Sequence, residues 1–313
     1  MFYNVKMQIA GIIIEMYSKY KVKLIDDALE QTKETSDNEP GERYKDFLYN
    51  GKRKPDIRIK VKVVNRLPHA KRIKTMFITI HFQDGKENWR LLRTNGGFIY
   101  KSPVKDKKLY VTINRVFDKA VVYLLPKKEK DYVWNMTDII YDFLQVFLIN
   151  YLAQRNEGIF THAFGVRDLD GKGLLFSGKS GCGKSSSARL WHEHSKAMVL
   201  NDDRIIVRKY NGKFFIYNSP WHGIFNDYIV SRIKSAPLEK LFFIHHSHKN
   251  VARKTSEKEA FSLLYPALFP TFWDKKCLVN IVSFSQDLIK KVPSYSLGFV
   301  NDEKVIGFVR SLT

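Results

Sequence analysis

The residues best suited to chemistry in this chain form a glycine-rich stretch near its middle. Residues 178–185 read GKSGCGKS and fit the pattern G-x-x-x-x-G-K-[ST]. Backbone N–H groups can curl around phosphate oxygens where Cβ atoms are absent, as at the glycines here. The spacing predicts that Lys184 reaches the β- and γ-phosphates of a nucleotide and that Ser185 offers its hydroxyl to Mg²⁺. The residues expected to bind the nucleotide are Gly178, Ser180, Gly181, Cys182, Gly183, Lys184, Ser185 and Ser186.

A pair of carboxylates follows the glycine-rich stretch. Asn201, Asp202 and Asp203 come directly after the apolar run Met198–Leu200. Adjacent side chains at a strand end point in different directions, so one carboxylate can hold the metal while the other meets an attacking hydroxyl. The expected metal ligands are therefore Ser185, Asp202 and Asp203, and the sequence leaves open which Asp has which role.

Local patterns predict the elements that must position these residues. Gly173–Ser177 (GLLFS) predicts a strand, Ser186–His194 a helix and Ala197–Leu200 a second strand. A strand, a glycine loop and a helix in this order are the context that the phosphate-binding pattern requires. Thr137 can cap an earlier helix that extends to about Asn156.

The first part of the chain is predicted to be mainly β. Turn dipeptides separate its strand-like runs, which favours an antiparallel sheet. Those runs are one or two strands in 1–25 and then Ile57–Val64, Thr75–Phe82, Trp89–Leu92, Phe98–Tyr100, Leu109–Ile113 and Ala120–Leu125. Lys33–Lys54 is polar and predicts a linker or insertion. We expect a β-rich domain over 1–134 and a catalytic domain over 135–313.

Composition limits the class of protein. With 313 residues, 44% of them hydrophobic, the chain can form one or two packed domains. Its only cysteines, Cys182 and Cys277, fit no disulfide framework or zinc pattern, which favours a reducing cytoplasm. The low-pKa redox role open to a cysteine near a helix start remains an alternative for Cys182. No apolar run is long enough to span a bilayer, and no signal peptide is expected.

The net charge of +21 predicts an anionic partner. The densest runs of Lys and Arg are Gly51–Lys54, Lys71–Lys74 and Lys105–Lys108. No nucleic-acid-binding motif lies beside them, so these runs are either solvated faces or a docking surface.

From Thr161 through GLLFSGKSGCGKSS to LNDDRIIV, the chain resembles the HPr kinase/phosphorylase family, whose core is similar to that of phosphoenolpyruvate carboxykinases. Asn218–Gly223, Ala236–Ile244 and Val292–Leu297 resemble HPr kinase-like serine kinases, including kinases of lasso-peptide precursors. The resemblance covers about 158–311. It implies an α/β fold with a P-loop HPr kinase-like C-terminal domain, here preceded by a mainly β (α+β) domain. The family's E-[LIV]-R-G-x-G signature has no counterpart, which argues against HPr as the substrate.

The resemblance places His162 before the glycine loop and Asp202 and Asp203 after its helix. These residues and Lys184 are the expected catalytic residues. His222 and the phosphate-charge stabilisers Arg204, Arg232 and Arg253 are candidates for the substrate side. His245, His246 and His248 lack the spacing of a metal cluster.

Together these features predict a cytoplasmic kinase that uses ATP and Mg²⁺ to phosphorylate a serine of a peptide or small protein. The basic first domain would recognise that acceptor. Two alternatives remain open: a kinase of a small metabolite such as free serine, and a nucleotide-binding regulatory or nucleic-acid-binding module without phosphotransfer. A membrane partner is not expected and nucleic acid is not favoured, whereas the resemblance implies homo-oligomers.

Overall fold

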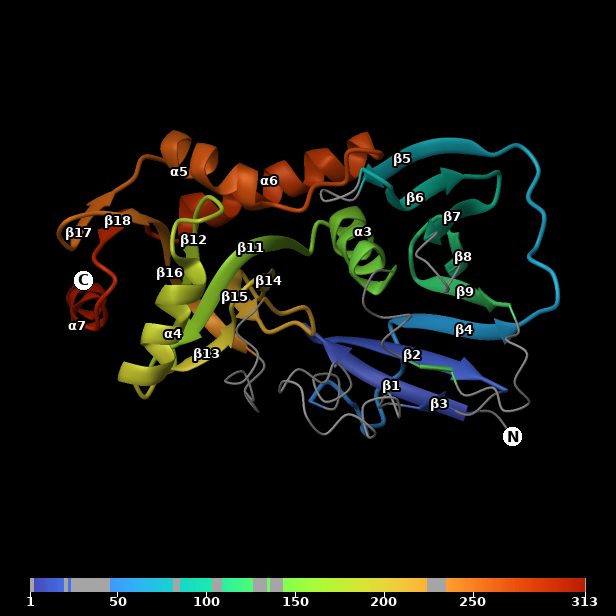
Figure 1. Ribbon diagram of the computed structural model, residues 1–313, viewed down its shortest axis with the longest axis horizontal. Helices are drawn as coiled ribbons and strands as arrows, with labels where there is room; N and C mark the ends of the chain where they lie inside the picture. The colour runs from blue at the N-terminus through green and yellow to red at the C-terminus, as the bar shows by residue number, and fades with distance from the viewer. Residues whose placement is uncertain are drawn as a thin grey trace. The chain divides into compact units, whose positions relative to one another are not determined.

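A computed structural model describes residues 3–19, 22–23, 46–80, 85–102, 109–125, 134–135, 143–223 and 235–312. The chain forms two compact units, residues 1–151 with 272–275 and residues 152–271 with 276–313. Both units are built mainly of strands (Figure 1). No helix in the described part of the chain is long and apolar enough to cross a membrane. Whether 1–134 and 135–313 divide recognition from catalysis stays a prediction.

The first unit contains an eight-stranded sheet in the order β1-β2-β4-β9-β8-β7-β6-β5. Its strands are β1 (Tyr3–Ile9), β2 (Ile12–Ser18), β4 (Ile57–Val63), β5 (Lys74–Ile80), β6 (Glu87–Arg93), β7 (Gly97–Ser102), β8 (Leu109–Asn114) and β9 (Lys119–Leu124). The predicted runs from residue 57 onward are thus confirmed as strands. A separate parallel pair joins β3 (Val22–Lys23) to β10 (Trp134–Asn135).

The prediction of an antiparallel sheet was wrong for its middle. Strand β4 runs parallel to both of its neighbours, β2 and β9. Parallel neighbours need a long connection, and long stretches of chain separate β4 from β2 and from β9. Most of Lys33–Lys54, predicted as a linker, lies outside the described residues.

Helix α3 (Gln145–Arg155) leads into the second unit. It confirms the end of the predicted helix, whereas the expected cap at Thr137 lies outside the described residues. Asn156 has a positive φ of 54° and terminates the helix before strand β11 (Gly158–Arg167).

The second unit contains another eight-stranded sheet, in which β12 (Gly173–Ser177) pairs with both β11 and β16 (Ser235–His246). The extra pairing closes β12, β11, β14, β15 and β16 into a ring. The remaining strands are β13 (Met198–Asn201), β14 (Arg204–Tyr210), β15 (Lys213–Tyr217), β17 (Val251–Lys254) and β18 (Ser294–Phe299). The strand prediction for Gly173–Ser177 is confirmed.

Helices pack on two apolar faces of this unit (Figure 1). Helices α5 (Glu257–Leu264) and α6 (Lys275–Lys291) contribute to one buried cluster, and α4 (Lys184–His194) and α7 (Lys304–Ser311) to another. A short 3-10 turn, η3 (Tyr265–Ala267), follows α5. Each face of the sheet is therefore covered by its own helices.

Aromatic stacking fixes the strand that precedes the glycine loop. The Phe176 ring lies 4.4 Å from that of Phe164 on β11 and 5.0 Å from that of Phe242 on β16, both nearly parallel to it. Trp191 of α4 packs on Phe176 at 5.8 Å and is 1% exposed. These contacts set where β12 ends and where α4 lies above it.

We expect Phe176→Ala to destabilise the second unit by about 3–5 kcal/mol, because it removes the central ring of this stack and leaves a cavity. Denaturant unfolding monitored by near-UV circular dichroism measures the change. Tyr210→Ala, at a ring 65% exposed, is the control and should cost less than about 0.5 kcal/mol. Equal costs for the two substitutions would contradict the role of the stack.

Candidate active site

The glycine loop 178–183 connects β12 to α4. Gly181 and Gly183 have positive φ angles of 78° and 91°, a conformation that side chains oppose. A Cβ on Gly183 would also lie 2.9 Å from the Phe299 ring. Gly183 is the N-cap of α4, so the helix begins at Lys184 and not at Ser186 as predicted. The loop therefore turns tightly into a helix N-terminus, where backbone N–H groups favour an anion.

Lys184 lies against the loop that precedes it. Its Nζ donates to the carbonyl oxygens of Gly178 at 2.9 Å and Lys179 at 3.1 Å, and the residue is 7% exposed. Ser180, Ser185 and Ser186 are exposed around it. The charge of Lys184 is thus held against the glycine loop, next to serine side chains that are exposed to solvent.

Cys182 is not a reactive thiolate. Burial raises the pKa of its thiol, and the charge of Lys184 and nearby backbone N–H groups offset only part of this rise. The thiol therefore stays protonated at neutral pH. The direction of this shift argues against the alternative of a low-pKa redox cysteine.

Strand β11 holds the loop and the acid pair on its two edges. Ala163 pairs with Ser177, the last residue before the loop, and Gly165 pairs with Asn201, the last residue before the acids. His162 is the residue before Ala163 on β11, so it lies one position beyond the last pair that β11 forms with β12. One strand thereby brings together the two motifs that the sequence separates.

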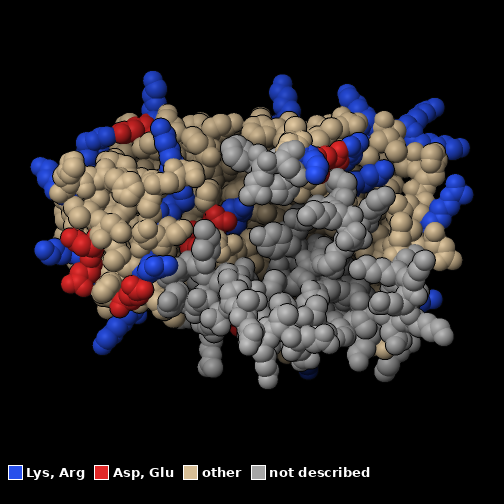
Figure 2. Space-filling model, viewed as in Figure 1, with Lys and Arg blue, Asp and Glu red and all other residues tan. Residues whose placement is uncertain are grey.

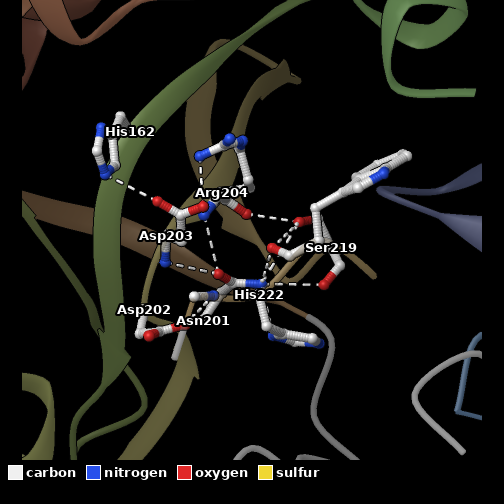
Figure 3. A network of polar contacts seen from close by, with 9 residues as sticks. His162, Asn201, Asp202, Asp203, Arg204, Ser219 and His222 are labelled. Carbon is white, nitrogen blue, oxygen red and sulfur yellow. Dashed lines mark hydrogen bonds and ion pairs between the residues drawn. The ribbon is translucent and has the colours of Figure 1, made fainter. Parts of the chain in front are cut away.

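A buried amide orients the turn that carries the acids. Asn201 is fully buried, and its Oδ1 accepts hydrogen bonds from the backbone N–H groups of Asp203 at 2.8 Å and Arg204 at 2.9 Å. Its Nδ2 donates to the carbonyl oxygens of Ser219 at 2.9 Å and Trp221 at 3.0 Å (Figure 3). The amide therefore ties the acidic turn to segment 218–222.

Asp203 is held between two basic side chains. Its Oδ1 lies 2.8 Å from Nε2 of His162, and its other carboxylate oxygen accepts from Arg204. Burial raises the pKa of Asp203, but the hydrogen bond from His162 and the charges of Arg204, His162 and Lys184 together lower it below its ordinary value. Asp203 is therefore anionic at neutral pH and feels the charge of the loop lysine.

Asp202 points away from Asp203, as the sequence predicted (Figure 3). It is 2% exposed, and its Oδ1 accepts from the backbone N–H of Gly223 at 2.8 Å. A Cβ on Gly223 would lie 2.5 Å from the other Asp202 oxygen, so the glycine permits this close approach. The two carboxylates thus have separate surroundings.

The candidates for the substrate side divide between two places. His222 joins the network, with its Nδ1 3.0 Å from Nδ2 of Asn201, and Arg204 lies in it as well, its guanidinium 4.6 Å from the centroid of the Phe269 ring. Arg253 lies elsewhere, on β17, where it forms an ion pair with Glu259. Arg232 lies outside the described residues.

Sequence reasoning missed three residues at this site. Asn201 and Ser219 shape the acidic turn, and Ser219 Oγ donates to the Arg204 carbonyl at 2.6 Å. His246 stacks on Phe299 and places Nε2 3.2 Å from the carbonyl oxygen of Gly181. An Asn before Asp-Asp is a recognisable turn pattern, whereas the place of His246 depends on the pairing of β16 with β12.

The expected metal ligands offer the right chemistry for Mg²⁺, which prefers carboxylate and hydroxyl oxygens. Ser185 is exposed on the first turn of α4, and Asp202 and Asp203 supply carboxylates. Among the described residues, no group of three His, Cys, Asp or Glu side chains forms a metal-binding cluster. Any ion here would therefore take part of its coordination from water or from phosphate oxygens.

No protein-family model matches this sequence, and no curated protein matches it. Among solved structures, the chain is similar to the HPr(Ser) kinase/phosphatase from Coxiella burnetii, with 12% identity and a TM-score of 0.30 over 48% of this chain and 95% of that one. The likeness is weak, and family membership stays a prediction.

We expect Asn201→Ala to lower the free energy of unfolding by about 3 kcal/mol, because it leaves buried N–H and C=O groups without partners. Asn301→Ala, at an exposed asparagine of the same unit, is the control and should change little. Thermal unfolding monitored by circular dichroism measures both. A cost for Asn201→Ala as small as that of the control would contradict the role of the amide.

Asp203 should also make stability depend on pH. Because its pKa is lowered in the folded state, its contribution is complete above the unfolded pKa of about 3.9 and is lost as the pH falls through the folded value. The difference in melting temperature between wild type and Asp203→Asn should therefore shrink as the pH falls below about 4. A difference that persists unchanged to pH 2 would contradict the assigned shift.

Proposed function

We propose that this protein is an ATP- and Mg²⁺-dependent kinase that transfers the γ-phosphoryl group to a serine hydroxyl of a peptide or small protein. The observation that supports it most is the placement of the glycine loop and the acid pair on the two edges of β11, with His162 beside them. Phosphoryl transfer needs phosphate binding, charge neutralisation and a proton acceptor within one site.

The proposed roles follow from the contacts. The loop N–H groups and Lys184 hold the phosphates, and Lys184 exchanges its bonds to the loop carbonyls for bonds to phosphate oxygens. Ser185 and Asp202 hold Mg²⁺, which supplies charge neutralisation at the phosphates when bound. Arg204 lies beside the acids, where it can stabilise charge on the transferred group.

Asp203 and His162 form the proposed proton-accepting pair. Asp203 Oδ1 accepts from His162 Nε2 at 2.8 Å, which fixes the tautomer and leaves Nδ1 as the acceptor for the serine proton. The His162 side chain is 40% exposed, so an acceptor hydroxyl can approach it. Asp203, kept anionic, stabilises the imidazolium that forms.

We expect Lys184→Ala to reduce transfer of the γ-³²P label by at least about a hundredfold, because it removes the charge that meets the phosphates. Asp203→Asn should do the same, because it removes the negative charge that stabilises the imidazolium of His162. Lys179→Ala, at the exposed lysine of the same loop, is the matched control and should retain transfer. Label incorporation into a library of serine-containing peptides, with free serine as a separate acceptor, measures the activity.

Retained transfer by Lys184→Ala would refute the proposal. Label on free serine alone would identify a metabolite kinase. Salt-sensitive binding of RNA or DNA with no phosphorylated product would identify a regulatory or nucleic-acid-binding module.

A further inference from the structure

One face of the first unit's sheet carries basic side chains at alternate positions of a strand. On β4, Ile57, Ile59 and Val61 are buried, while the residues between them turn to the other face. Those residues are Arg58, Lys60 and Lys62, so each second position of the strand presents a cation. Elsewhere on the same unit, over β5 to β9, most of the charged side chains that Figure 2 shows are Lys and Arg.

Neighbouring strands extend this face. Lys119 of β9 lies opposite Arg58, and Lys101 of β7 lies opposite Arg90 of β6. We call Arg58, Lys60, Lys62, Lys101 and Lys119 the lysine face. None of these residues belongs to the dense runs of Lys and Arg in 51–54, 71–74 and 105–108.

Like charges placed directly opposite each other destabilise a sheet. Nearby acids relieve this only in part, since Glu15 binds Arg58 at 3.2 Å and Glu87 binds Arg90. Lys60 and Lys62 have no ion-pair partner among the described residues. The sheet therefore maintains a concentration of positive charge that its own packing does not require, which points to an anionic partner.

The tyrosines of this face argue for a peptide over a nucleic acid. Single-stranded nucleic acids bind sheets by stacking bases on open aromatic rings. Here Tyr110 is 4% exposed, with its hydroxyl bonded to the Pro68 carbonyl at 3.1 Å. Lys62 Nζ lies 5.9 Å from the centroid of the Tyr123 ring, and the Tyr110 and Tyr123 rings form a T-shaped pair. The Tyr110 ring is therefore closed to a nucleic-acid base, and the Tyr123 ring lies beside an ammonium group.

We propose that the lysine face binds an acidic protein segment in extended conformation, with carboxylates at alternate residues. An extended chain and β4 share a side-chain period of two, so carboxylates spaced in this way meet Arg58, Lys60 and Lys62 in register. We assign this segment to the phosphoryl acceptor, and that assignment rests on the proposed function. The binding itself does not, because the face lies within the first unit.

Fluorescence anisotropy with the full-length protein and no ATP tests the proposal. The probe is a fluorescein-labelled peptide of alternating Glu and Ser, about twelve residues long, which spans the strand in extended form. Lys60→Gln combined with Lys62→Gln should weaken binding by about tenfold or more. Lys213→Gln combined with Lys258→Gln, at two exposed lysines of the second unit, makes the same charge change and should alter binding less than about twofold.

Two further measurements separate loss of the face from loss of the fold or of catalysis. The Lys60/Lys62 variant should melt near the wild-type temperature, because neither lysine forms an ion pair with a described residue that the substitution would break. Lys184→Ala should bind the peptide as wild type does, whatever its transfer activity. Unchanged binding by the Lys60/Lys62 variant, equal binding of an alternating Gln and Ser peptide, or tighter binding of an oligothymidylate of the same length would each overturn the proposal.

Discussion

The side-chain amide of Asn201 is the contact on which the candidate active site depends. Its oxygen caps the turn that carries Asp202 and Asp203, and its nitrogen binds the carbonyls of Ser219 and Trp221. A buried amide with all of its capacity used has one low-energy orientation, so the turn inherits that orientation. Because the backbone of the turn is held in this orientation, the Asp202 and Asp203 carboxylates point in different directions. One buried side chain, that of Asn201, therefore determines the surroundings of both carboxylates.

The arrangement around this turn depends on β11, which pairs with β12 along one edge and with β13 along the other. Register along β11 determines how close the glycine loop comes to the acids, and the aromatic stack through Phe176 prevents β12 from slipping. Lys184 therefore stands near enough to lower the pKa of Asp203. Packing in the core thus sets an electrostatic property of the site.

Sequence patterns predicted the parts of this structure that depend on neighbouring residues. The strand Gly173–Ser177 and the different directions of the two carboxylates follow from local periodicity. Helix α4 begins at Lys184, earlier than the predicted Ser186, because Gly183 is its N-cap. Contacts between distant segments were not predictable. The parallel neighbours of β4 and the place of His246 beside the loop depend on which strands pair, and a single sequence contains no record of that choice.

The positive charges of the chain are arranged differently in its two units. In the second unit, Lys184 and Arg204 are bound to a carbonyl cradle and to Asp203, so each charge is oriented and partly neutralised. On the first sheet, Lys60 and Lys62 stand side by side on one strand with no acid opposite them. Oriented charges suit a small anion held at fixed distances, whereas a field of similar charges suits a longer anionic chain that adapts to it. The composition gives only the net charge of the chain, whereas the register of the strands distinguishes these two arrangements of charge.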